Sequence, residues 1–162
     1  MSVQKKTISV IVENQPGVLA RVAGLFSGRN FNIESLAVGE TESHDVSRMT
    51  IVASGDEIVL DQIIKQLNKL VDTIKVIDMT GDDFVEREMA LIKVNIKGKS
   101  KDDLMHTINI FKAEVLDATN DTYLIEITDT DERINSFLEL MQEYGVKEMV
   151  RTGTVALGKA KK

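Results

Sequence analysis

The turn after the first apolar run carries the residues best suited to bind a small ligand. Asn14, Pro16 and Gly17 stand at the predicted start of a helix, where free backbone N–H groups and the helix dipole favour an anion. Glycine lets a ligand approach the backbone closely because it has no side chain. Val18 and Leu19 follow at once and would give such a pocket an apolar wall. A zwitterion with an aliphatic side chain would satisfy this combination.

A second amide, from Asn32 in a strand-like segment, could donate and accept hydrogen bonds in the same pocket. The turn also has a simpler interpretation, because Asn-x-Pro-Gly is a favourable turn and Asn is a favourable helix cap. The residue types alone leave both interpretations open, a ligand site and a plain turn.

The other reactive side chains do not form a recognisable catalytic or metal-binding motif. His44 and His106 lie in different halves of the chain, and there is no His-Glu-x-x-His motif. The segment Gly98-Lys99-Ser100 resembles the end of a phosphate-binding loop, but Lys93 stands where the Walker motif needs its first glycine. The carboxylates at residues 129–132 are typical of a helix start, where they interact favourably with the dipole. We therefore expect no catalytic residues and no metal site.

Composition restricts the class of protein further. The 162 residues include 20 Lys and Arg against 26 Asp and Glu, and a net charge of −6 has the wrong sign for a nucleic-acid-binding surface. The absence of cysteine excludes disulfides and thiolate metal sites. There is no apolar signal segment near Met1, and charges interrupt every apolar run before it could cross a membrane. We expect a cytoplasmic protein that binds neither nucleic acid nor a membrane.

Short strands and helices alternate along the chain, and their order occurs twice. The first eighty residues follow the order β-α-β-β-α-β, which is typical of a ferredoxin-like unit. The expected strands are residues 7–13, 31–38, 46–53 and 73–79, with helices that start at Pro16 and after Asp56. An RNA-recognition domain shares this order, but it needs stacking aromatic residues, which are only 4% of this chain.

A polar linker at residues 81–86 precedes the second pass through this order. The expected strands are residues 90–96, 113–119, 122–128 and 146–155, with helices capped by Ser100 and Thr130. The predicted fold class is α+β, with two tandem ferredoxin-like βαββαβ units. They would occupy residues 1–80 and 87–158, followed by a basic tail at residues 159–162.

The first predicted helix has an outer face of small residues. Its apolar stripe lies opposite Ala20, Ala23, Gly24 and Ser27, where a solvated helix usually carries long charged side chains. Gly24 costs ~1 kcal/mol relative to alanine in a helix interior, so helix propensity does not explain it. A small-residue face and exposed sheet edges both favour pairing, so we expect a homodimer or a larger assembly.

Eight segments of the chain match a known pattern in combination. They are Glu13–Leu19, Arg21–Val22, Gly24–Phe26, Asn32–Leu36, Ser47–Ile51, Gln66–Val71, Val85–Glu88 and Met149–Gly153. Together they resemble the acetohydroxyacid (acetolactate) synthase small-subunit family, whose amino-terminal domain is an ACT domain. The resemblance covers nearly the whole chain, and it is less distinctive in the carboxy-terminal half.

This resemblance implies a regulatory subunit without catalytic residues, acting in valine, leucine and isoleucine biosynthesis. It would bind the large catalytic subunit, raise its activity and confer feedback inhibition by a branched-chain amino acid, with valine the first candidate. The cofactors of that transferase, thiamine diphosphate, Mg and FAD, would belong to the large subunit, and this chain would hold none. Two alternatives are a free-standing ACT-domain amino-acid sensor with another partner and a small enzyme, but the enzyme would lack a base and a nucleophile.

The resemblance also implies where the effector binds. Two ACT domains would pair side by side, with the effector between the strand–helix turn of one subunit and the second strand of its neighbour. The expected effector-binding residues are Asn14, Gln15, Pro16, Gly17, Val18, Leu19, Asn32 and Ile33, and the expected dimer contacts are Ala20, Ala23, Gly24 and Ser27. The connection at residues 97–100 lacks the Asn-x-x-Gly pattern, so no second site of this kind is expected.

Overall fold

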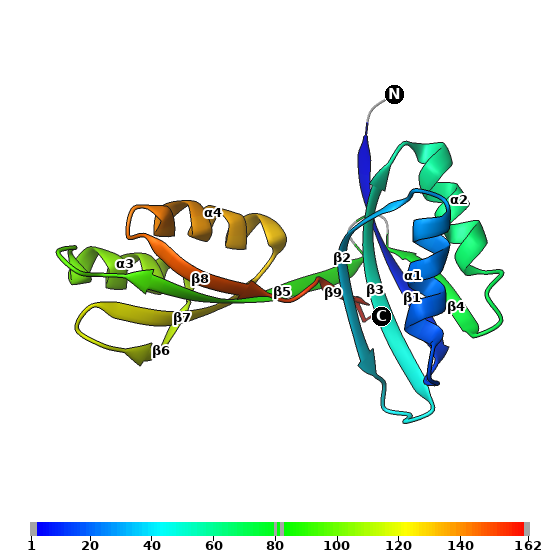
Figure 1. Ribbon diagram of the computed structural model, residues 1–162, viewed down its shortest axis with the longest axis horizontal. Helices are drawn as coiled ribbons and strands as arrows, with labels where there is room; N and C mark the ends of the chain where they lie inside the picture. The colour runs from blue at the N-terminus through cyan, green and yellow to red at the C-terminus, as the bar shows by residue number, and fades with distance from the viewer. Residues whose placement is uncertain (1–2, 80, 82, 161–162) are drawn as a thin grey trace. The chain divides into compact units, whose positions relative to one another are not determined.

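A computed structural model describes residues 3–79, 81 and 83–160 (Figure 1). The chain divides into two compact units, the first comprising Met1–Val85 with Gly153–Lys162 and the second Glu86–Thr152. The boundary after Val85 falls inside the expected linker. Residues 1, 2, 80, 82, 161 and 162, which include parts of the expected linker and basic tail, lie outside the described residues.

The first unit is a four-stranded antiparallel sheet with two helices on one face (Figure 1). Its elements are β1 (Gln4–Glu13), α1 (Val18–Gly28), β2 (Asn32–Glu40), β3 (Val46–Gly55), α2 (Glu57–Leu67) and β4 (Thr73–Met79). The strand order is β2-β3-β1-β4, which makes β2 and β4 the edges of this sheet. The order of elements is the one that the alternating apolar pattern predicts.

One side of this sheet and the inner faces of both helices form the core of the first unit. Side chains alternate between the two faces of a strand, so every second residue of β1 and β3 points toward the helices. The buried core residues are Ile8, Val10, Val12, Val18, Val22, Leu25, Phe26, Met49, Ile51, Ala53, Leu60, Ile63 and Leu67. Packing of α1 and α2 against this face fixes where the β1–α1 turn begins.

The second unit repeats this architecture. Its elements are β5 (Phe84–Asn95), α3 (Lys101–Phe111), β6 (Glu114–Ala118), β7 (Thr122–Asp129), α4 (Asp131–Gln142) and β8 (Val146–Arg151). The strand order is β6-β7-β5-β8, with a separate core that includes Ile92, Leu104 and Phe137. The predicted α+β fold of two βαββαβ units is therefore confirmed.

Two expected boundaries differ from the structure. β5 begins at Phe84, so residues 84–86 of the expected linker are part of a strand. The single strand expected at residues 146–155 is two strands, β8 and β9 (Val155–Gly158), because residues 152–154 have no strand structure; β9 then pairs with β5 as well. Residues 153–158, which we assigned to the second domain, belong to the first unit. Alternation alone could not reveal this, since β9 is short and returns to residues far away in sequence.

Candidate functional site

The turn between β1 and α1 starts its helix without a side-chain cap. Gly17 is the N-cap residue at φ 87°, a left-handed conformation that favours glycine, and no side chain bonds to the first helical turn. By contrast, Asp56, Ser100 and Thr130 cap α2, α3 and α4, and each of these helices has an acidic residue in its first turn. Among the four described helices, only α1 keeps its first N–H groups free of a side-chain acceptor, which suits an anion.

Asn14 ties this turn to the β2–β3 hairpin. Its Nδ2 donates to the carbonyl oxygen of His44 (2.7 Å) and to Oε1 of Glu40 (3.2 Å), while its backbone N–H donates to the Asp45 carbonyl (2.8 Å). These bonds fix the orientation of the amide. Its oxygen makes no hydrogen bond to the described part of the chain, and it can accept one from a ligand ammonium group.

Arg21, one turn into α1, places a cation beside Gly17. Its guanidinium binds the nearly buried carboxylate of Asp72 through Nε–Oδ2 (2.5 Å) and Nη2–Oδ1 (3.0 Å). This hydrogen bonding holds the pKa of Asp72 below its ordinary value and raises the pKa of Arg21. A Cβ added at Gly17 would lie 3.1 Å from Nη1 of Arg21. A side chain at residue 17 would therefore crowd the Arg21 guanidinium, which would have to shift slightly.

Arg21 and Asp72 are not among the site residues expected from the sequence. The two residues are 51 positions apart, so no local spacing joins them. The signal that could have found Arg21 is its place four residues after Gly17, one helical turn into α1.

The expected apolar wall is smaller than the sequence suggests. The Val18 side chain is only 3% exposed and packs in the core of the first unit, so it cannot contact a ligand without rearrangement. Leu19 is 47% exposed, and Ile33 is half-buried. Gln15 and Pro16 are exposed at the turn. Of the three apolar residues expected to bind the effector, Leu19 and Ile33 remain accessible.

Within one chain, the turn and the expected residues of β2 lie far apart. Glu13, next to the turn, pairs with Val46 at the start of β3, whereas Asn32 pairs with Ser54 near its end. These positions are separated by eight residues of β3, or about 26 Å at 3.3 Å per residue. Asn32 and Ile33 can join the turn in one site only if they come from a second copy of the chain.

The small residues of α1 form an accessible surface. Ala20, Ala23, Gly24 and Ser27 are all exposed, and a Cβ added at Gly24 would meet nothing within 4 Å. α1 contacts β2, whereas α2 contacts β4, so this surface lies on the side of the unpaired β2 edge. Helix and strand together present a surface that another copy could cover.

Comparison with known proteins identifies the family. Residues 8–75 match the family described as AHAS small subunit-like ACT domain, and residues 87–160 match the family described as small subunit of acetolactate synthase. A protein of Archaeoglobus fulgidus named "probable acetolactate synthase small subunit" is 51% identical over 158 residues, which cover 98% of this chain and 99% of that protein. The chain belongs to the acetolactate synthase small-subunit family.

Two further relatives agree with this small-subunit assignment. The acetolactate synthase small subunit of Aquifex aeolicus is 48% identical over 156 residues, covering 96% of this chain and 81% of the relative. The crystal structure of the acetolactate synthase small subunit from Thermotoga maritima superimposes with a TM-score of 0.89 at 38% identity, covering 98% and 99% of the two chains. The resemblance found in the sequence is confirmed, and the first unit is an ACT domain.

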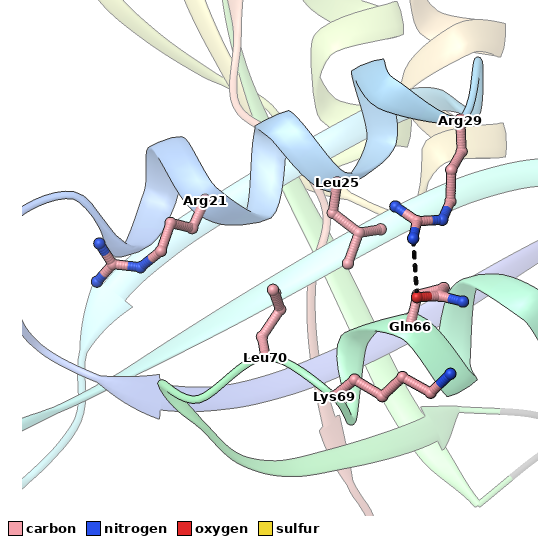
Figure 2. Close-up of a pocket in the computed structure, with 6 residues that line it drawn as sticks. All are labelled: Arg21, Leu25, Arg29, Gln66, Lys69 and Leu70. Carbon is pink, nitrogen blue, oxygen red and sulfur yellow. Dashed lines mark hydrogen bonds between the residues drawn. The ribbon is translucent and has the colours of Figure 1, made fainter.

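A groove in the small subunit's ACT domain separates α1 from α2 and has a volume of about 260 Å³ (Figure 2). Leu25 and Leu70 contribute apolar surface, and Arg29 donates from Nη2 to Oε1 of Gln66 (3.0 Å). Figure 2 shows the Arg21 side chain pointing away from the two leucines, toward the start of α1. Arg21 also lines the groove, so this residue borders both the groove and the β1–α1 turn.

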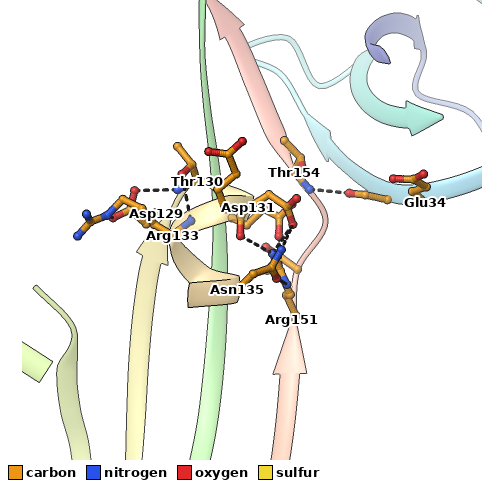
Figure 3. Close-up of polar contacts among 12 residues, drawn as sticks. Glu34, Asp129, Thr130, Asp131, Arg133, Asn135, Arg151 and Thr154 are labelled. Carbon is orange, nitrogen blue, oxygen red and sulfur yellow. Dashed lines mark hydrogen bonds and ion pairs between the residues drawn. The ribbon is translucent and has the colours of Figure 1, made fainter. Parts of the chain in front are cut away.

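The second unit places its conspicuous carboxylates in ion pairs (Figure 3). Arg151 binds Glu88 (Nε–Oε2, 2.6 Å), Asp131 (Nη2–Oδ1, 2.7 Å) and the Asn135 amide oxygen (Nη1–Oδ1, 2.7 Å). Within the described residues there is no cluster of three or more His, Cys, Asp or Glu that could hold a metal, and no helix is long and apolar enough to cross a membrane. Through Arg151 of β8, these ion pairs link β8 to β5 and to α4.

Proposed function

We propose that this small subunit is the regulatory subunit of an acetolactate synthase. It would raise the activity of the catalytic large subunit and make it sensitive to valine or a related branched-chain amino acid. Thiamine diphosphate, Mg and FAD would belong to the large subunit. The observation that carries the effector part of this proposal is the uncapped start of α1 in a chain that matches acetolactate synthase small subunits over 98% of its length.

The turn supplies complementary groups for each part of an aliphatic amino acid. The carboxylate would bind the backbone N–H groups after Gly17, with Arg21 one turn away, and the helix dipole adds up to ~2 kcal/mol in a partly buried site. The ammonium group would donate to the oxygen of Asn14. Leu19 would contact the aliphatic end, for which burial contributes ~1.5–3 kcal/mol.

A symmetric dimer would bring the missing β2 residues to this turn. Antiparallel pairing of two β2 edges about a two-fold axis near Leu36 would place Asn32 of one copy opposite Glu40 of the other, because both lie four residues from that axis. Glu40 already contacts Asn14. Asn32 and Ile33 of each copy would thus complete the site of the other, and two equivalent sites would form.

Reconstitution with the cognate large subunit tests this function. The small subunit alone should form no acetolactate from pyruvate. Adding it to the large subunit should raise the rate, and valine should then inhibit only the reconstituted enzyme. Titration calorimetry of the full chain with valine, leucine and isoleucine would rank the effectors. A chain that binds valine but leaves the large subunit unaffected would instead be a free-standing ACT-domain sensor, and acetolactate synthesis by the chain alone would contradict a regulatory role.

A further inference from the structure

The carboxy-terminal segment Gly153–Gly158, here called the strap, covers the face of the first sheet that the helices do not. Thr7, Ser9 and Thr50 point to this face because they alternate with core residues, yet each is 8% exposed or less. β9 pairs with β5 and contacts β1, and Ala156 of the strap is itself only 5% exposed. The strap therefore completes the first unit, although it follows the second unit in the sequence.

The strap makes its closest approach at the middle of β2. A Cβ built on Gly153 would lie 2.5 Å from the carbonyl oxygen and 2.6 Å from the carbonyl carbon of Leu36. The two distances are nearly equal, so a Cβ on Gly153 would lie beside the Leu36 carbonyl bond rather than beyond its oxygen. Only glycine fits this contact without a shift, and no strand of the described residues pairs with the outer edge of β2.

A hydrogen bond fastens the next residue of the strap to β2. The backbone N–H of Thr154 donates to Oγ of Ser35 (2.8 Å), and Thr154 is 4% exposed (Figure 3). The register of β2 with β3 shifts between Ile33 and Ser35, which marks a β-bulge. Bulges re-aim the side chains next to them. The strap thus holds β2 immediately after the bulge that follows Asn32 and Ile33.

We infer that the strap positions the β2 half of the effector site, with Ser35 and Gly153 as its positioning residues. This inference rests on the proposed function. Ser35 and Gly153 would not touch the effector, but their contacts fix the bulge and so the direction of Asn32 and Ile33. The strap follows β8 after Thr152, so it joins the β2 half of the site to the second unit along the chain. Because linkage is reciprocal, effector binding must in turn tighten or loosen the strap.

Substitutions on both sides of the contact test the positioning role. Ser35→Ala removes the acceptor of the Thr154 bond, whereas Ser35→Thr keeps a hydroxyl. Gly153→Ala forces the strap away from Leu36, whereas Gly28→Ala, at the end of α1, adds a Cβ with nothing within 4 Å. In calorimetry of the full chain, we expect valine to bind about tenfold more weakly to Ser35→Ala and Gly153→Ala. Ser35→Thr and Gly28→Ala should stay within twofold of the unmodified chain.

Amide hydrogen exchange separates positioning from mere stability. Saturating valine should change the exchange rate of the Thr154 amide at least threefold. The Ala113 amide, which bonds to Ile108 in the second unit, is the internal control and should not change. The inference is overturned if valine binds the unmodified chain while Thr154 exchange is unchanged and Ser35→Ala and Gly153→Ala bind valine normally. If valine does not bind the unmodified chain, the proposed function fails, and this inference fails with it.

Discussion

The two units share one topology but begin their first helices in different ways. In the second unit, the Ser100 hydroxyl accepts a bond from the Asp103 N–H (3.2 Å), and two carboxylates lie in the first turn of α3. In the first unit, Gly17 has no side chain that could cap the helix, and α1 has no acidic residue in its first turn. One helix start is satisfied by its own side chains, which stabilises the unit. The other is left open, which is what an anionic ligand requires.

The two sheets also differ on the side away from the helices. The strap buries this face in the first unit, whereas the second sheet exposes a shallow apolar groove of about 230 Å³. Leu91, Leu124 and Val150 line it, beside an ion pair between Lys93 and Glu148 (2.8 Å) whose hydrogen bond lowers the pKa of Glu148. The strap therefore covers the outer face of the first sheet, whereas part of the outer face of the second sheet stays exposed.

The largest expected effect comes from matched glycine substitutions in the two β–α turns. Gly17→Asp places a carboxylate near Arg21 and the α1 N–H groups, where it competes with the carboxylate of the effector. Loss of one such charge-assisted interaction costs ~1.5–3 kcal/mol, so the valine concentration for half-inhibition of the reconstituted enzyme should rise about 10–100-fold. Stimulation of the large subunit should persist.

Two controls separate charge from backbone strain. Gly17→Ala has the same positive φ to accommodate but no carboxylate, so it should have a smaller effect than Gly17→Asp. Gly98→Asp changes the corresponding turn of the second unit, also at positive φ (72°), and should leave valine sensitivity unchanged. If Gly17→Asp and Gly98→Asp lost valine sensitivity equally, the β1–α1 turn would not be the specific effector site that we propose.

The next largest effect concerns the outer face of α1. Ala23→Glu places a charge on the surface of α1 that the proposed dimer would cover in each copy, so the dimer dissociation constant should rise at least about tenfold. His106→Glu, at an exposed position of α3, is the matched control and should leave dimerisation unchanged. Sedimentation equilibrium over a concentration series measures both. An unchanged dissociation constant for Ala23→Glu would place the dimer contact elsewhere.

Local patterns predict the elements but not the contacts that close each unit. Alternation and helical stripes identify both βαββαβ orders, and Asp56, Ser100 and Thr130 mark their helix starts correctly. Residues 153–158 pack against the first unit through contacts such as that between Gly153 and Leu36. These two residues are more than a hundred positions apart, and no periodicity in the sequence encodes such a contact. The burial of Val18 likewise depends on how α1 packs. Its place in the apolar stripe of the helix predicts a core residue, whereas its place beside the turn predicts a contact with the ligand.

A smaller effect should come from the cap of α3. Ser100→Ala removes the acceptor for the Asp103 N–H and should lower the free energy of unfolding by ~1 kcal/mol. Valine binding should not change, because this helix start serves stability. Urea unfolding and calorimetry measure the two quantities. A Ser100→Ala variant with normal stability but weaker valine binding would reverse the roles that we assign to the two helix starts.

The smallest effect is the pH dependence contributed by Asp72. Hydrogen bonds from Arg21 hold its pKa in the folded protein below the ordinary value of 3.8. The unfolded chain therefore binds the proton first as the pH falls, and the stabilisation is fully present above about pH 4 and lost as the pH falls through the lower, folded-state pKa.

Asp72→Asn should reduce the free energy of unfolding at pH 6, and the difference from the unmodified chain should shrink toward pH 3. The effect is small because the Arg21 side chain is 47% exposed and solvent screens the pair. Urea titrations from pH 3 to pH 6 measure this difference, and a difference that grows toward low pH would mean that Arg21 does not stabilise the Asp72 carboxylate.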